Sequence, residues 1–229
     1  MITPRLEMIL RHIKGKSCAD IGTDHAYVPI ELAKLGKRVI ATDIMPGPLK
    51  IAEENVKKNG AEIELRLGGG LSPIEKDEVD TIIIAGMGGE MIEKILSEGS
   101  AKTDGVTFIL QPMNRQYELR NYLFNSGFYI IEEDLAVEGF KVYNLIVATK
   151  DESKSGQALV YNNEAEKHLP AFLKENPCFK ALYDKKRREF SKILSGLLKS
   201  KDANPEDIRK LEQLLLKIDK IGGVENENK

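Results

Sequence analysis

The sequence has no tryptophan, only two cysteines and only three histidines. Cys18 and Cys178 stand in unrelated contexts, so they cannot form a disulfide framework or, alone, a zinc site, and a reducing compartment is expected. The longest apolar runs are about six residues, whereas a membrane-spanning helix needs roughly 20. The first residues lack the apolar segment of a signal peptide. We therefore expect a cytoplasmic protein that binds neither a membrane nor a metal.

An excess of one charge sign is also missing. The 229 residues include 34 basic and 36 acidic side chains, a formal net charge of −2, which excludes a uniformly basic nucleic-acid-binding protein. Any basic surface must therefore be local, and residues 178–201 contain eight basic and only two acidic residues. Apolar residues make up 41% of the chain, which is enough to bury a core.

The polar segment 151–156 is typical of a linker, and we place a domain boundary there, with domains at 1–152 and 153–229. Before it, short apolar runs alternate with helical stretches, which predicts an α/β fold with a parallel sheet covered on both faces. The expected strands are residues 17–21, 38–43, 63–67, 81–85 and 107–111, and the expected helices are 5–12, 28–34, 47–59, 89–96 and 116–126.

Two longer runs, 128–137 and 141–148, close the first domain. Only three residues separate them, and so short a connection can form only a hairpin, so the sheet should end in an antiparallel strand. Beyond the boundary we expect a helix at about 163–175 and then two amphipathic helices joined by a turn at 202–205. Their apolar stripes could close within the chain or pair with a second copy, so we expect a monomer or a weak dimer.

The turn after the first strand contains Asp20, Gly22 and Asp24. Gly22 permits a tight turn at the carboxyl edge of the sheet, where open α/β sheets bind ligands. Asp24 replaces the second glycine of a dinucleotide fingerprint, and its charge would repel a diphosphate but attract an ammonium or sulfonium. Asp43 ends the second strand, where an acid typically accepts ribose hydroxyls. The alternatives are an ordinary turn with a capping Asp24 and an Asp43 that only favours a helix N-terminus.

Glycines follow the third and fourth strands as well. Gly69 and Gly70 leave backbone amides uncovered, which suits a flat adenine, although they could equally form a flexible loop. Gly86 exposes backbone where a second substrate would meet the cofactor, and Met87 offers a soft apolar surface to a planar ring. Close packing between strand and helix is the alternative explanation for this pair.

After the fifth strand, Gln111 or Asn114 could recognise a base edge through amide donors and acceptors. Asn114 could instead serve only as a turn residue, because Pro and Asn both favour turns.

Three segments together resemble the bacterial TrmK family: Asp-Ile-Gly-Thr-Asp-His-Ala-Tyr at 20–27, Ile-Ala-Gly-Met-Gly-Gly at 84–89 and Gln-Pro-Met at 111–113. The resemblance covers nearly the whole chain. It implies an S-adenosylmethionine-dependent methyltransferase acting on N1 of adenine 22 in tRNA. It also implies a seven-stranded Rossmann-like domain whose last strand is antiparallel, followed by a helical coiled-coil domain that helps to hold tRNA.

The resemblance assigns Asp20 and Gly22 to the methionine end of the cofactor and Asp43 to its ribose. One departure concerns the third turn, because related sequences often carry Gly-Asp-Gly there and Gly69 occupies the acid's position. Adenine recognition would then rely on backbone groups, including those of Gly69 and Gly70, or on a neighbouring side chain. Gly86 lies at the edge that faces the same cofactor.

Methylation of N1 leaves adenine cationic, and a nearby carboxylate would stabilise that charge. We assign this role to Asp24. His25 is the second candidate, as a proton acceptor or a stacking ring, and Tyr27 could stack on the base. In the alternative view Asp24 only caps the first helix and His25 contributes only a backbone amide.

The run of four basic residues from 185 to 188 spreads around more than one helical turn, so some of its charges must face solvent. We assign Lys185, Arg187 and Arg188 to tRNA binding, although a solvated helix face is the usual meaning of such a run. Two other functions stay open: methylation of a small molecule or protein, and non-catalytic RNA binding on an inactive Rossmann-like scaffold.

Overall fold

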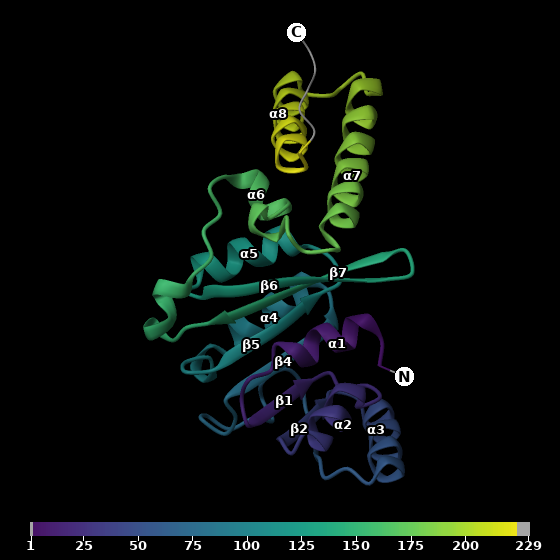
Figure 1. Cartoon of the computed structure of the whole chain (residues 1–229), viewed down its shortest axis with the longest axis vertical. Helices are drawn as coiled ribbons and strands as arrows, with labels where there is room; N and C mark the ends of the chain where they lie inside the picture. The colour runs from purple at the N-terminus through teal and green to yellow at the C-terminus, as the bar shows by residue number, and fades with distance from the viewer. Residues whose placement is uncertain (1, 224–229) are drawn as a thin grey trace. The chain divides into compact units, whose positions relative to one another are not determined.

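The computed structural model describes residues 2–223 and contains two compact units (Figure 1). The first comprises the chain up to Glu138 together with Tyr143–Leu159, and the second comprises Gly139–Val142 together with the chain from Val160 onward. The boundary predicted at residues 152 and 153 falls inside a short 3₁₀ helix, η2 (Glu152–Gln157), whose first turn is capped by the Asp151 carboxylate. The linker predicted from polar composition is therefore ordered.

The first unit is built on one seven-stranded sheet with the order β3-β2-β1-β4-β5-β7-β6. Strands β1 to β5 pair in parallel, and β7 pairs with β5 in antiparallel fashion, which confirms the predicted fold class and its antiparallel strand. The strands are β1 (Ser17–Ile21), β2 (Arg38–Asp43), β3 (Glu64–Leu67), β4 (Thr81–Met87), β5 (Thr107–Pro112), β6 (Tyr129–Glu138) and β7 (Lys141–Thr149).

Helices cover both faces of this sheet, and their ends follow local sequence signals. Thr3 caps the first helix by accepting from the Leu6 N–H, and Pro4 occupies the first turn, where a missing N–H costs little. Gly60 adopts the left-handed conformation that ends the third helix. The helices are α1 (Pro4–Arg11), α2 (Tyr27–Lys34), α3 (Pro46–Asn59), α4 (Gly89–Glu98), η1 (Ser100–Lys102) and α5 (Gln116–Asn125).

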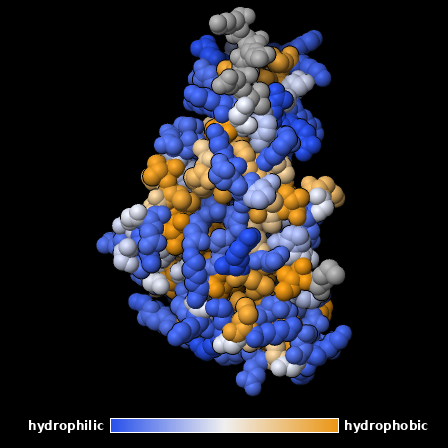
Figure 2. Space-filling model, in the orientation of Figure 1, coloured by the Kyte–Doolittle hydropathy of each residue, from blue (hydrophilic) through white to orange (hydrophobic). Residues whose placement is uncertain are grey.

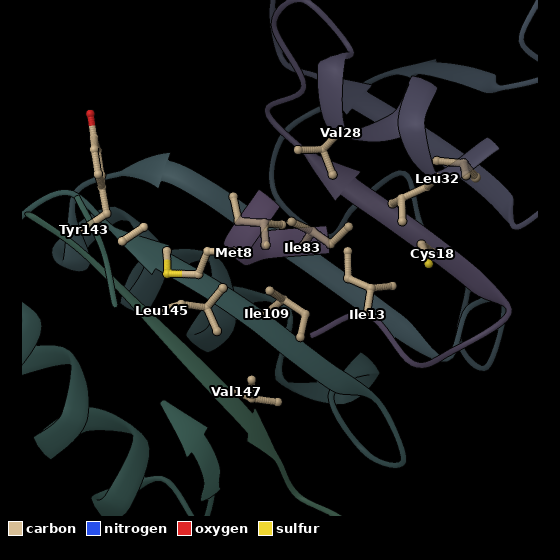
Figure 3. Packing of buried hydrophobic residues seen from close by; sticks show 13 residues of the cluster. Met8, Ile13, Cys18, Val28, Leu32, Ile83, Ile109, Tyr143, Leu145 and Val147 are labelled. Atoms are coloured by element: carbon tan, nitrogen blue, oxygen red, sulfur yellow. The ribbon is translucent and has the colours of Figure 1, made fainter. Parts of the chain in front are cut away.

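A large apolar cluster lies between the sheet and helices α1 and α2 (Figure 3). Met8 of α1 is fully buried and belongs to the same cluster as Ile83 of β4 and Leu145 of β7. Burying a side chain of this size contributes about 1.5–3 kcal/mol. Helix α1 is therefore part of the fold, and its position on the sheet is fixed by packing.

Strand β4 continues two residues beyond its predicted end. The pairing with β5 shifts between Ala85 and Met87, and Gly86, at φ +81°, is the extra residue of a β-bulge. The Met113 N–H then donates to the Met87 carbonyl at 2.8 Å. Placing the end of the strand at Ala85 was therefore wrong, because a glycine inside a strand marked a bulge and not a break.

The single helix predicted for residues 163–175 was also wrong. Helix α6 covers only Glu164–His168, and a separate 3₁₀ turn, η3 (Ala171–Leu173), follows it. Pro170 causes the break, because the residue before a proline is pushed out of the helical region, and Leu169 has φ −138° and ψ +89°.

The two amphipathic helices of the second unit are confirmed as α7 (Phe179–Lys199) and α8 (Pro205–Ile221), joined by a turn that ends at Asn204, the N-cap of α8. Buried Asp219 of α8 accepts from the Tyr183 hydroxyl and from the Arg187 Nε, both at 2.8 Å. These two bonds fix α7 against α8. Figure 2 shows that most of the visible surface of this helical pair is hydrophilic. The coiled-coil assignment and the monomer or weak dimer stay predictions.

The carboxyl end of α1 is fastened to β6 by a charged cluster. His12 lies between two carboxylates, with its Nδ1 2.8 Å from Glu132 Oε2 and its Nε2 2.8 Å from Asp134 Oδ2. Arg11 and Lys14 face the same two acids. The hydrogen bond with Asp134 raises the pKa of His12 above 6.5 and outweighs the effect of burial, and the pKa values of both acids are lowered.

We expect His12→Gln to lower the free energy of unfolding by about 1.5–3 kcal/mol near pH 6, because a glutamine amide can replace at most one of the two charge-assisted hydrogen bonds of His12. A raised pKa in the folded state stabilises the fold fully below pH 6.5, and this contribution disappears as the pH rises through the folded pKa. The difference between wild type and His12→Gln in urea unfolding should therefore shrink between pH 6 and pH 9. Lys14→Gln, at an exposed position of the same cluster, is the control and should show no such trend; an equal difference at both pH values would contradict the prediction.

Within residues 2–223, no helix is long and apolar enough to cross a membrane. The same residues contain no group of three or more His, Cys, Asp or Glu side chains arranged to hold a metal ion.

Candidate active site

The turn after β1 adopts an unusual backbone conformation. Gly22, Asp24 and Ala26 have φ values of +74°, +48° and +58°, all in the left-handed region. Such a conformation costs a non-glycine residue about 1–2 kcal/mol, and the packing of buried Ala26 in a small apolar cluster offsets this strain. The N–H groups of Gly22 and Thr23 both donate to the Thr42 carbonyl at 2.9 Å. The turn is therefore tied directly to the end of β2.

Two carboxylates flank this turn at the ends of adjacent strands. Asp20 of β1 is 6% exposed and Asp43 of β2 is 8% exposed. Burial raises the pKa of Asp20 to about 6, although the Thr23 hydroxyl and the charge of Arg5 lower it. Two buried acids at the ends of adjacent strands favour a ligand that carries positive charge and hydroxyl donors. Both acids were predicted at this edge, and the structure brings them together.

Asp43 is held in place by backbone N–H groups. Its Oδ1 accepts from the Met45 N–H at 2.9 Å, and its Oδ2 accepts from the Asp24 N–H at 3.4 Å. A carboxylate has about four acceptor positions, so these bonds leave capacity for further donors such as a pair of ribose hydroxyls.

An apolar edge lies beside the third turn. A Cβ added to Gly69 would lie 2.9 Å from Ile44 Cδ1, so the absence of a side chain at position 69 lets Ile44 lie against the backbone. Ile44 is 71% exposed and Leu67 is 58% exposed, which offers a surface for a flat ring. The Gly69 carbonyl accepts from the Ser72 N–H and hydroxyl. Ile44 was not predicted as a site residue, although its position directly after Asp43 was a usable signal.

The bulge in β4 directs Met87 back over the first turn. A Cβ on Gly22 would lie only 2.2 Å from Met87 Cε, so this methyl group lies directly over Gly22. Asn114 is close by, because its Oδ1 would lie 3.0 Å from a Cβ on Gly88. The Gly89 N–H donates to the Asn114 carbonyl at 3.2 Å. Met87 and Asn114, both assigned to substrate binding, therefore come from neighbouring turns at one edge of the sheet, and Gly70 and Gly86 belong to the same edge.

Asp24, His25 and Tyr27 form an exposed group at the mouth of the turn. His25 Nε2 lies 3.5 Å from Asp24 Oδ2, and the His25 and Tyr27 rings stack with centroids 5.3 Å apart. The Asn55 amide donates to the His25 carbonyl at 3.0 Å and so fixes this backbone. The structure brings together the three residues assigned to base binding and catalysis, and their individual roles stay predictions.

Helix α1 contributes a residue that the sequence analysis did not consider. Arg5 Nη1 donates to Gln111 Oε1 at 3.0 Å, and a Cβ on Gly86 would lie 3.7 Å from the same nitrogen. Arg5 and Gln111 are more than 100 positions apart in the chain, so no local pattern connects them. The site therefore combines acids from β1 and β2 with a cation from α1.

The basic run of α7 is not uniformly available to a ligand. Lys185 is half-buried, and burial lowers its pKa. Lys186 is buried beside Glu189, and Arg187 is bound to Asp219. Arg188 is exposed and forms no ion pair within the described part of the chain.

Known proteins resemble this chain in sequence and in fold. A family described as a methyltransferase domain matches residues 2–146. The tRNA (adenine(22)-N(1))-methyltransferase of Bacillus subtilis is 38% identical over 153 residues, which cover 64% of this chain and 64% of that protein. The crystal structure of the B. subtilis M1A22 tRNA methyltransferase TrmK superposes with a TM-score of 0.80 at 30% identity and covers 98% of each chain. The chain belongs to the TrmK family.

A second member of this fold group extends the likeness to a cofactor complex. Streptococcus pneumoniae Sp1610 bound to S-adenosyl-L-methionine superposes with a TM-score of 0.80 at 31% identity, over 96% of this chain and 99% of that one. The resemblance stated from the three motifs is therefore confirmed, and the superpositions cover 96–98% of this chain.

Proposed function

We propose that this protein transfers a methyl group from S-adenosylmethionine to N1 of adenine 22 in tRNA. The observation that carries the proposal is the pair of buried acids, Asp20 and Asp43, around a left-handed glycine turn in a chain of the TrmK family. When bound, S-adenosylmethionine supplies an electrophilic methyl group on a cationic sulfur.

The residues at this edge fit that cofactor. Asp43 is oriented to accept the two ribose hydroxyls, and Asp20 supplies negative charge for the methionine ammonium. A Cβ at Gly22 would meet Met87, and one at Gly69 would meet Ile44, so the two glycines let these apolar side chains pack against the turns. Ile44 and Leu67 supply the apolar surface for adenine, in place of the acid missing at Gly69.

The target base approaches from the exposed side of the same turn. Adenine N1 carries its own lone pair, so the chain needs no general base to prepare it. N1 is covered in a base-paired stack, so the nucleotide must be unpaired or flipped, at a cost of a few kcal/mol. The stacked His25 and Tyr27 rings offer a surface that offsets this cost, and Asp24 stabilises the positive charge that develops on the product.

The proposal is tested with unmodified tRNA transcripts and cofactor labelled on its methyl group. We expect one labelled N1-methyladenosine per transcript when position 22 is adenine, and no incorporation when the transcript carries guanine there. Mapping the labelled nucleoside identifies the position. Equal labelling of both transcripts, or label on protein instead of RNA, would contradict the proposal and favour one of the other substrate classes.

A further inference from the structure

Helix α1 brings a positive charge to the edge of the sheet that holds the two buried acids. Arg5 is partly buried, donates to Gln111 Oε1 at 3.0 Å and lies with its guanidinium carbon 5.7 Å from the Tyr143 ring centroid. Among residues 2–223 it forms no ion pair. A guanidinium has five N–H donors, and the bond to Gln111 occupies one of them. Arg5 is therefore prepared to bind an anion.

The surroundings of Arg5 restrict what this anion can be. Gln111 is fully buried, so its side chain cannot move into solvent. The hydrogen bond to its amide oxygen therefore holds the guanidinium at one place. Asp20 is close enough for the charge of Arg5 to lower its pKa, and a Cβ on Gly86 of β4 would lie 3.7 Å from Arg5 Nη1. A phosphodiester placed here would gain attraction from Arg5 but would be repelled by Asp20.

A zwitterion avoids this conflict. The methionine moiety of S-adenosylmethionine carries an ammonium and a carboxylate on one carbon atom, which match Asp20 and Arg5 respectively. Resting on the proposed function, we infer that Arg5 binds the carboxylate of this moiety, that Gln111 is the positioning residue for Arg5, and that Asp20 faces the ammonium. The methyltransferase domain would then bind its cofactor with a residue from the helix that precedes the sheet.

Two ligands separate the amino-acid end from the rest of the cofactor. S-adenosylhomocysteine carries the zwitterion, whereas 5′-methylthioadenosine has the same adenosine and a thioether but no amino-acid end. In calorimetric titrations we expect Arg5→Ala to lower the affinity for S-adenosylhomocysteine about 10- to 100-fold, which is the effect of one charge-assisted hydrogen-bonded pair. Its affinity for 5′-methylthioadenosine should change by less than about twofold, and Arg5→Lys should restore part of the loss.

Arg11→Ala is the matched control, because Arg11 lies on the same helix and its charge is used at Asp134, away from the acids of the cradle. It should leave both affinities unchanged. If Arg5→Ala lowered the affinities for both ligands equally, the inference would be overturned in favour of a merely structural role of Arg5. Unchanged S-adenosylhomocysteine affinity together with weaker tRNA binding would overturn it in favour of a phosphate site. A wild-type chain that bound neither ligand would overturn the proposed function itself, and the inference with it.

Discussion

Asp43→Ala is expected to weaken the binding of S-adenosylhomocysteine by about 100- to 10,000-fold. The substitution removes the acceptor for two hydroxyl donors, and each hydrogen bond to a charged group contributes about 1.5–3 kcal/mol. Asp43 is 8% exposed, so little water can replace the lost carboxylate. Asp43→Asn should lose less, because its remaining amide oxygen can still accept from the Met45 N–H. Calorimetry with both variants measures the difference.

Asp80 provides a matched control at the opposite edge of the sheet. It precedes β4, and its Oδ2 accepts from the N–H groups of Lys16 and Ser17 at 2.8 and 3.1 Å, much as Asp43 accepts from two backbone groups. Asp80→Asn should therefore lower stability without changing cofactor affinity. If Asp80→Asn lost as much cofactor affinity as Asp43→Asn, Asp43 would act through the stability of the sheet and would have no direct role in binding.

The acids of the site were predictable because they lie next to strand ends. An apolar run fixes where a strand stops, and the parallel arrangement brings all such ends to one edge, so Asp20 and Asp43 follow from local patterns. Arg5 did not follow, because its role depends on packing that brings α1 close to Gln111 across more than 100 positions of sequence. Long-range contacts of this kind leave no periodic signal.

Two other differences have local causes that the patterns concealed. The fourth strand was predicted to end at Ala85, before Gly86, yet in the sheet Gly86 is the extra residue of a bulge that directs Met87 over Gly22. Pro170 was absorbed into a helical pattern, although its effect on Leu169 ends α6. In both places the backbone conformation set by one glycine or proline decided the local structure, and the hydrophobic periodicity around it did not.

Only the structure shows which basic side chains of α7 are free to bind RNA, because a run of charges in the sequence does not show which of them form ion pairs. Arg187 is engaged by Asp219 and Lys186 by Glu189. Arg188, Lys192 and Lys199 are exposed, and they stand four and seven residues apart, which places them on one face of the helix. We define these three residues as the α7 basic stripe, and within residues 2–223 none of them forms an ion pair.

Replacing all three residues of the α7 basic stripe by glutamine should weaken tRNA binding about 10- to 100-fold. Each lost phosphate contact should also reduce the slope of log K against log[salt] by about 0.7–0.9, so that three contacts reduce it by about 2–3. Filter binding at several salt concentrations measures both quantities. Because the free charges of the stripe lie on one face, their effect should exceed that of the same number of charges placed elsewhere.

Arg209, Lys217 and Lys220 of α8 are exposed as well, and replacing these three by glutamine removes the same total charge. This second variant should keep most of the affinity and most of the salt slope if the stripe itself holds the RNA. Equal losses in the two variants would show that tRNA responds only to the net charge of the helical unit. Unchanged RNA binding in both variants would place the RNA contacts outside these six residues. Such a result would not bear on cofactor binding at the sheet edge.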